Sequence, residues 1–429
     1  MKTLKELKYF IFLWLTQSFS SLGSAMTNFA LVIWLYEDSG SALTTALLTV
    51  CSYAPYVIMS IFAGVISDKW NKKAVMLVCD SFAAACTAVT LILLKTGSLE
   101  VWHLYILNGL NGLMNSVQAP ASDVASTLLT PEKHYQKTSG MRYFSSSLVS
   151  ILTPVFAAAM VSFAGVEAVM LFDLSTFAAA FLILLLFIRI PEADKESDSG
   201  ETVLQSAKNG IGYLKSNRGI LYMILFLSAI NLIASIHNAI LPAMVLSKSN
   251  EATLGFVSGC VGAATLLGSL IATFFPKPKS RITVMCNCLL FAMSMENFLL
   301  AFSGSPAIWC VGAFLGWTAI PLMSANYDVI LRSNVPTEMQ GRVYSIRNTL
   351  QFFTIPLGYF LGGLLVDNVF EPFMASASER GMLNVFFGKG KGSGAAFLFF
   401  IIGVAGVAVC LIFRRIKAMR ALEEKTDNI

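Results

Sequence analysis

Long runs of apolar residues dominate this chain and limit the structures that it can form. Twelve runs of roughly 17 to 28 residues are almost free of charge, and each is long enough to cross a hydrocarbon core of about 30 Å. They lie at 10–35, 42–66, 74–94, 101–129, 144–164, 168–188, 220–246, 254–275, 282–302, 307–331, 348–366 and 395–413. Only helices and closed barrels satisfy their backbone groups in lipid, and these runs are too long for barrel strands. The sequence therefore predicts an all-α polytopic membrane protein with 12 transmembrane helices.

The basic residues predict how the helices are oriented. If both termini are cytoplasmic and the spans alternate, the inner segments hold 25 of the 30 Lys and Arg residues. Such an excess of basic residues on one side follows the positive-inside rule and predicts a multi-pass protein of the cell membrane. The net charge of +5 thus reflects sidedness, and nothing in it favours nucleic-acid binding.

A polar connection at 189–219 divides the chain into halves. We expect an N-terminal six-helix bundle at 1–190, a cytoplasmic linker at 191–219 with a helix on the membrane surface, and a C-terminal six-helix bundle at 220–429. The halves also resemble each other, since Asp123 and Pro131 are eight residues apart, as are Asp328 and Pro336. This spacing favours two pseudo-symmetric repeats with a substrate site near mid-depth.

One charged stretch lies between the second and third runs and reads GVISDKWNKKAVM. It resembles the signature loop of the major facilitator superfamily at Gly64, Asp68, Lys69, Lys72 and Lys73. The resemblance implies that Asp68 caps and pairs with the start of the eleventh span when an inner gate is closed. The alternative is an ordinary positive-inside loop.

A second motif narrows the resemblance to the drug–proton antiporter group that includes the macrolide efflux pumps. The stretch VPTEMQGRVYSIRNTL carries that group's pattern at Pro336, Glu338, Gly341 and Arg342. The resemblance implies export of small molecules by alternating access, coupled to protons. Asn111 occupies the position where many antiporters carry an Arg, which puts any coupling scheme built on that Arg in doubt.

Polar residues in the spans that line the centre of the family's fold are the candidates for substrate contact. These are Gln17, Asn28, Asn111, Asn115, Gln118, Asn231, His237, Asn238, Trp317 and Asn326. Buried amides are expensive in lipid unless they face partners or water. The competing interpretation is helix–helix packing, in which amides bond across interfaces.

Five acidic residues within the spans are candidates for proton coupling, because ionisable groups in lipid are costly and mark function by default. They are Asp80, Asp123, Asp173, Glu296 and Asp328. Each also has a structural interpretation: Asp123 and Asp328 as caps near the inner boundary, Asp80 as a partner of the basic loop, and the other two as packing groups in peripheral spans.

Small residues spaced four apart predict close helix contacts, at Gly255 and Gly259 and again at Gly358 and Gly362. The stretch GKGKGSG at 388–394 lacks the Gly-Lys-Ser/Thr ending of a phosphate-binding loop, so we expect an ordinary outer loop there.

Three functions fit these observations. The first is secondary active export of hydrophobic drugs or metabolites by proton antiport, and the second is export of one endogenous compound such as a siderophore, peptide or lipid-like molecule. The third is a membrane scaffold or sensor without transport. We expect no enzyme activity, no metal and no cofactor, a neutral or cationic hydrophobic substrate, protons and lipid as partners, no nucleic acid, and a monomer. Because no buried Lys or Arg is expected mid-span, an anionic substrate is disfavoured.

Overall fold

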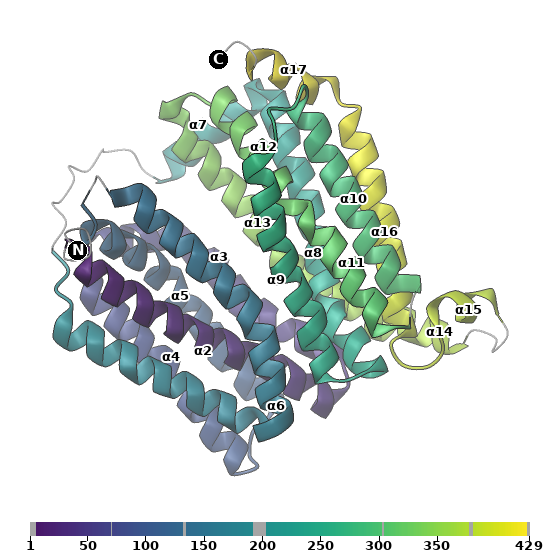
Figure 1. Ribbon diagram of the computed structural model, residues 1–429, viewed down its shortest axis with the longest axis horizontal. Helices are drawn as coiled ribbons and strands as arrows, with labels where there is room; N and C mark the ends of the chain where they lie inside the picture. Colours follow the sequence, from purple (N-terminus) through teal and green to yellow (C-terminus); the bar gives the residue numbers. More distant parts are fainter. Residues whose placement is uncertain are drawn as a thin grey trace. The chain divides into compact units, whose positions relative to one another are not determined.

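The computed structural model describes residues 6–69, 71–131, 134–191, 203–302, 304–376 and 381–426, and these residues form helices and no strands (Figure 1). The helices are α2 (Lys8–Ser39), α3 (Ala42–Lys69), α4 (Lys72–Lys95), α5 (Val101–Leu128), α6 (Tyr135–Phe187), α7 (Val203–Ser216), α8 (Arg218–Lys248), α9 (Glu251–Phe274), α10 (Arg281–Phe302), α11 (Pro306–Thr318), α12 (Ile320–Asn334), α13 (Thr337–Leu365), η2 (Val366–Phe370), α14 (Glu371–Ser376), α15 (Met382–Phe387), α16 (Ser393–Arg414) and α17 (Lys417–Thr426). The predicted all-α polytopic fold is confirmed.

Ten stretches of helix in the described residues are long and apolar enough to cross a membrane. Two further features relate this number to the twelve expected spans. The helix α6 is 53 residues long and is broken at Gly165, where φ is 79°, so it comprises two spans. The 28 residues of α5 cover the expected fourth span. This helix is not among the ten apolar stretches, and it contains amides such as Asn108 and Asn111, which lower its mean hydropathy.

Two expected spans differ in detail from the structure. The tenth, at 307–331, is divided into α11 and α12 at Ala319, and Pro321 at the start of α12 cannot donate a hydrogen bond to the preceding turn. The eleventh continues beyond residue 366 through the π-helical turn η2 into α14. The expected linker contains α7, and its location on the membrane surface stays a prediction.

Polar residues at the helix starts explain where several helices begin. Asn71 accepts a hydrogen bond from Ala74 N at 3.1 Å and caps α4, while Asn250 accepts one from Thr253 N at 3.0 Å and caps α9. Gly40 ends α2 in the left-handed conformation, with φ of 62°. Local chemistry therefore fixes these boundaries.

Contacts between Cα atoms divide the described residues into two compact units. Unit 1 contains α2, α3 from Leu47 onward, α4, α5, α6 and the segment Leu254–Gly259 of α9. Unit 2 contains Ser41–Ala46, α7, α8, the rest of α9 and all later helices. The expected bundle boundaries at 190 and 220 stay predictions.

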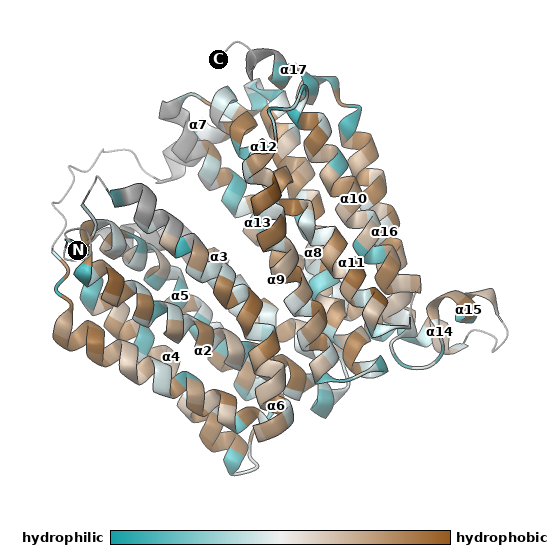
Figure 2. Ribbon diagram, viewed as in Figure 1, coloured by the Kyte–Doolittle hydropathy of each residue, from teal (hydrophilic) through white to brown (hydrophobic). Residues whose placement is uncertain are grey.

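The core of each unit is apolar, and so is the surface of its helices. In unit 1, Met26, Ala30 and Met170 are among the buried residues of one core cluster. In unit 2, Phe226 and Phe399 are fully buried, and Phe226 stacks on Phe413 with ring centroids 5.0 Å apart. Figure 2 shows apolar residues along the whole of most helices, as expected for helices that face lipid.

Carboxylates cap two helix starts in unit 2. Asp367 accepts hydrogen bonds from Ser41 Oγ at 2.6 Å, Ala42 N at 3.1 Å and Leu43 N at 2.8 Å, which secures the start of α3. Glu371 accepts hydrogen bonds from Gly392 N at 2.9 Å and Ala395 N at 3.2 Å, at the start of α16. The glycine-rich stretch 388–394 thus directs backbone N–H groups at a carboxylate of the same chain, which agrees with the expectation that it is no nucleotide loop.

Candidate functional site

A cavity of about 560 Å³ lies within unit 1. Helices α2, α3, α4, α5 and α6 all contribute to its lining. Of the predicted substrate-contact residues, this cavity collects Gln17, Asn28, Asn111, Asn115 and Gln118. Two predicted coupling acids, Asp80 and Asp173, line the same cavity.

Asp80 is held in this cavity by two amides. Its Oδ2 accepts a hydrogen bond from Gln17 Nε2 at 3.1 Å, and its Oδ1 accepts one from Gln118 Nε2. The side chain is 9% exposed. The partners come from α2 and α5, so Asp80 ties three helices together through neutral donors.

Asp173 is held by three hydroxyl groups. Ser24 Oγ donates to Oδ1 at 2.9 Å, while Thr27 Oγ1 and Thr87 Oγ1 donate to Oδ2 at 3.1 and 3.2 Å. No Lys or Arg of the described part of unit 1 forms an ion pair with Asp80 or Asp173. Two carboxylates therefore share one cavity, and their hydrogen-bond donors are neutral.

Asn111 occupies the position at which the family resemblance would place an Arg. It lines the cavity, and its Oδ1 atom is buried with no hydrogen-bond donor among the described residues. A buried acceptor without a partner is costly, so Asn111 is a polar group of this cavity wall whose oxygen lacks a donor among the described residues.

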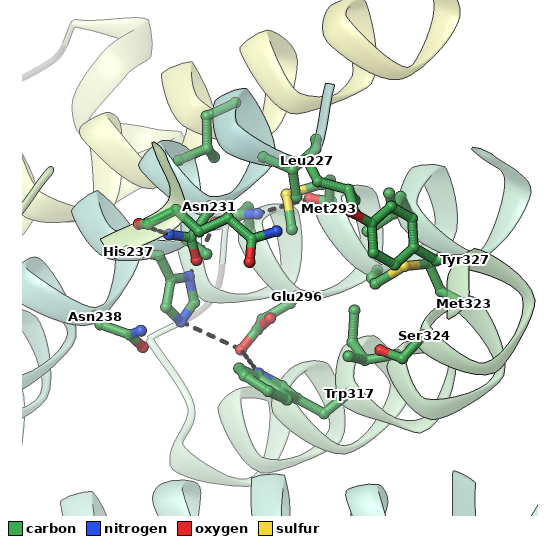
Figure 3. A pocket seen from close by; sticks show the side chains of 18 of the residues that line it. Leu227, Asn231, His237, Asn238, Met293, Glu296, Trp317, Met323, Ser324 and Tyr327 are labelled. Atoms are coloured by element: carbon green, nitrogen blue, oxygen red, sulfur yellow. Dashed lines mark hydrogen bonds and ion pairs between the residues drawn. The ribbon is translucent and has the colours of Figure 1, made fainter. Parts of the chain in front are cut away.

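A second cavity, of about 420 Å³, lies within unit 2 (Figure 3). It collects the predicted residues Asn231, His237, Asn238 and Trp317, together with the acids Glu296 and Asp328. The lining comes from α8, α10, α11, α12 and α13.

Glu296 and His237 form a buried pair at the wall of this cavity. His237 Nε2 lies 3.2 Å from Glu296 Oε1, and Trp317 Nε1 donates to the same oxygen at 2.9 Å. On the other side of the ring, His237 Nδ1 lies 3.1 Å from Asn297 Oδ1. Glu296 and His237 are 6% and 5% exposed. Glycine permits this arrangement, because a Cβ at Gly316 would lie 2.7 Å from the Cβ of Glu296.

The rest of this cavity is largely apolar and aromatic. Met293, Met323 and Tyr327 line it beside the acidic pair, as Figure 3 shows. A cation also lines it, Arg347, whose guanidinium lies 6.0 Å from the ring centre of Tyr327. Methionine and aromatic surfaces adapt to ligands of varied shape.

Two predicted residues lie away from these cavities. Asn326 is buried and accepts a hydrogen bond from Arg281 Nη1 at 3.0 Å, while its own amide donates to Leu322 O. Asp123 pairs with Arg142 at an exposed position. The contact of Asn326 matches the packing interpretation, whereas Asp123 forms an ion pair and no helix cap is seen for it among the described residues. Neither side chain lines the cavity of its unit.

The gate motifs are described only in part. Lys73 donates to Leu185 O at 2.9 Å and to Ile188 O at 2.8 Å, so it caps the end of α6. Lys72 is buried and Pro336 is exposed. Gly64, Asp68, Lys69, Glu338, Gly341 and Arg342 lie outside the residues whose side chains the structure describes, so the gate interaction stays a prediction.

Sequence reasoning missed the neutral partners of Asp173 and of His237. Ser24, Thr27, Thr87 and Asn297 are common residue types in helices, and only their contacts distinguish them. A search for Ser and Thr one turn apart on the first span would have found Ser24 and Thr27. Among the described residues, no group of three or more metal-ligating side chains is present.

Comparison with known proteins gives a consistent result. The family model described as "Major Facilitator Superfamily" matches residues 13–359. The chain is 24% identical to macrolide efflux protein A of Streptococcus pyogenes over 375 residues, which is 85% of this chain and 90% of that protein. It is 22% identical to multidrug efflux pump Tap of Mycolicibacterium fortuitum over 361 residues, 80% of this chain and 86% of the pump.

Solved structures share the fold. A point mutant of the nucleoside transporter NupG gives a TM-score of 0.69 at 16% identity, and the match covers 95% of this chain and 98% of the transporter. A bacterial homologue of the iron transporter ferroportin, in an inward-facing state, also gives 0.69, at 15% identity, and the match covers 96% and 99%. At these identities the likeness concerns the fold alone.

Proposed function

Since the chain belongs to the major facilitator superfamily, we propose that this transporter of the cell membrane exports hydrophobic, neutral or cationic small molecules in exchange for protons. The relatives at 22–24% identity are named as efflux proteins, which supports export as the direction of transport. Alternating access, implied by the family resemblance, is part of the proposal.

One observation carries the proposal: Asp80, Asp173 and Glu296 are buried at the walls of cavities, and their hydrogen bonds come from amides, hydroxyls, an indole and an imidazole. None of these three carboxylates forms an ion pair with a Lys or Arg among the described residues. A carboxylate paired with Lys or Arg stays ionised. These three carboxylates have no such partner among the described residues and can therefore bind either a proton or the transported molecule.

The lining also supports the substrate class. The described lining of the unit 1 cavity presents two carboxylates and no Lys or Arg, and that of the unit 2 cavity presents Glu296 and Asp328 against Arg347. Counted with ionised carboxylates and a neutral His237, both linings are acidic, which favours cations and neutral molecules over anions. Volumes of about 560 and 420 Å³ suit drug-sized molecules.

Transport by purified protein in liposomes tests the proposal. With an imposed pH gradient and a panel of lipophilic dyes and antibiotics, we expect uptake that collapses when a proton ionophore is added. Asp80→Asn and Asp173→Asn should each remove pH-driven uptake. Asp38→Asn, at an exposed position at the end of α2, is the matched control and should transport as the wild type does.

The alternative outcomes are distinct. If folded protein transports no member of the panel, the substrate is one dedicated compound and the proposed drug range is wrong. Uptake that persists unchanged with the ionophore, or in both cavity variants, would show that protons are not coupled through these carboxylates.

A further inference from the structure

The orientation of Asn297 defines the proton count of the buried pair in unit 2. Its Nδ2 lies 2.8 Å from Met293 O, and only an amide N–H can make that contact. The Oδ1 atom therefore faces His237 Nδ1 as an acceptor, at 3.1 Å. It follows that Nδ1 of His237 carries a proton and donates it to Asn297.

The other ring nitrogen faces Glu296. With Nδ1 protonated, Nε2 either donates to an ionised Glu296 or accepts from a protonated one, and both states hold the same single proton between the two groups. Loss of that proton would leave a buried carboxylate against an imidazole lone pair, with Trp317 as its remaining donor. The pair therefore needs one positive charge, which a proton supplies in the free protein.

Charged groups on neighbouring helices do not replace that charge. Asp328 and Tyr327 of α12 and Arg347 of α13 are the other ionisable side chains in the described lining of this cavity. Arg347 donates to Asn348 Oδ1 from Nε at 3.1 Å and from Nη2 at 2.9 Å, and it forms no ion pair with Glu296. From α11 and α16, the described neighbours of Glu296 and His237 are the rings of Trp317 and Phe399, which carry no charge.

The second oxygen of Glu296 is available to a ligand. The two partners of the Glu296 carboxylate, His237 and Trp317, both contact Oε1. Oε2 accepts no hydrogen bond from the described residues. Oε2 has no partner among the described residues yet is not fully buried, so it keeps accessible surface, and Glu296 lines the cavity. Around it, Trp317 and Tyr327 offer aromatic faces and Met293 and Met323 offer polarisable sulfur, a combination that suits an organic cation.

We propose that Glu296 is the binding site for the positive charge of a hydrophobic monovalent cation, and that this cation replaces the proton held between Glu296 and His237. This inference rests on the proposed function and assigns one of its proton-exchange steps to Glu296. A cation enters from water and contacts Oε2, and the shared proton leaves to water in the cavity. Afterwards Glu296 is ionised and His237 is neutral, with its proton on Nδ1. One positive charge enters and one leaves, so the charge of the site is unchanged.

Proton release on binding tests this exchange directly. The probe is tetraphenylphosphonium, a hydrophobic cation with no proton of its own, added to the purified full-length protein in detergent. Titration calorimetry in two buffers of different ionisation enthalpy gives the protons released per cation bound. We expect about one proton per cation, and by linkage an affinity that falls about tenfold for each unit of decreasing pH while the pair is protonated. Triphenylphosphine oxide, a neutral analogue, should release none.

Variants locate the site. Glu296→Gln should weaken tetraphenylphosphonium binding at least tenfold and remove proton release. His237→Gln, which can still donate to the carboxylate, should keep cation binding but move its pH dependence to lower pH. Glu251→Gln, in the first turn of α9 and outside the cavity, is the matched control and should behave as the wild type.

Each other result overturns the inference. Wild-type protein that does not bind the probe, or binds it without proton release, contradicts it, and this measurement needs no variant to fold. Folded Glu296→Gln protein with wild-type affinity and proton release also contradicts it. If either contradicting result is found but the protein still transports in liposomes under a pH gradient, the proposed function stands. Proton coupling would then lie at Asp80 or Asp173. Proton release without any transport would uphold the site and refute the function.

Discussion

The contact between α8 and α13 yields a sharp prediction for stability. Gly358 of α13 lies so close to α8 that a Cβ atom built there would be 2.5 Å from Ser235 Cβ, 2.8 Å from Leu232 O and 3.2 Å from Ile236 N. Two of these three atoms belong to the backbone, which no side-chain rotation can move. Gly358→Ala therefore forces the helices apart.

The magnitude follows from the geometry. Ordinary carbon contacts are about 3.5–4.0 Å, so the helices must separate by about 1 Å at this crossing. Overpacking of this kind costs about 1–3 kcal/mol, whereas replacing a helical glycine by alanine gains about 0.5–1 kcal/mol. The expected net loss of stability lies between about 0 and 2.5 kcal/mol, and is near the upper end because two of the three close atoms are backbone.

Thermal unfolding in one detergent, followed by tryptophan fluorescence, measures the effect. Gly212→Ala is the matched control, because a Cβ at Gly212 of α7 meets nothing within 4 Å and should raise Tm. We expect Gly358→Ala to lower Tm relative to both. If Gly358→Ala unfolds at or above the wild-type temperature while Gly212→Ala behaves as expected, the close approach of these helices is wrong.

Two further variants test single hydrogen-bonded groups. Asp367→Ala removes the acceptor for Ser41 Oγ and for two N–H groups at the start of α3, and should cost about 1–2 kcal/mol in the same unfolding assay; an unchanged Tm would mean that water caps this helix equally well. Trp317→Phe keeps the ring but removes the donor to Glu296, and should cost about 1.5–3 kcal/mol. Trp102→Phe, whose donor contacts Glu100 at an exposed site, should cost less than about 1 kcal/mol, and equal losses in the two variants would contradict the assigned role of burial.

The long apolar runs were sufficient to predict the fold, because only helices and closed barrels span lipid and these runs are too long for barrel strands. Nine of the ten residues predicted to contact substrate line one of the two cavities, since an amide such as Gln118 or Asn238 in an apolar run must find a polar partner or water. Helix ends were harder to predict: the continuation of α13 through η2 depends on tertiary contacts at Asp367 and Glu371. Likewise, the apolar pattern of 307–331 does not distinguish one helix from the pair α11 and α12, and the local signal for the division is Pro321.

The partners of the charged residues came from tertiary structure alone. Asn326 looks like Asn231 in sequence, yet one bonds Arg281 and the other lines a cavity and donates to Gln351 O. Family resemblance placed Asp173 and Glu296 in peripheral spans, whereas packing brings both to cavity walls.

By itself, the sequence determined that this chain spans the membrane as a bundle of helices and which polar residues lipid would not tolerate. Only the tertiary structure decided which of those residues meet. His237 and Glu296 are on different helices, and the side chain that fixes their shared proton, Asn297, is adjacent to Glu296 in the chain. Hydrogen bonds depend on distances of a few tenths of an ångström between helices, and those distances arise from packing, which no local pattern encodes.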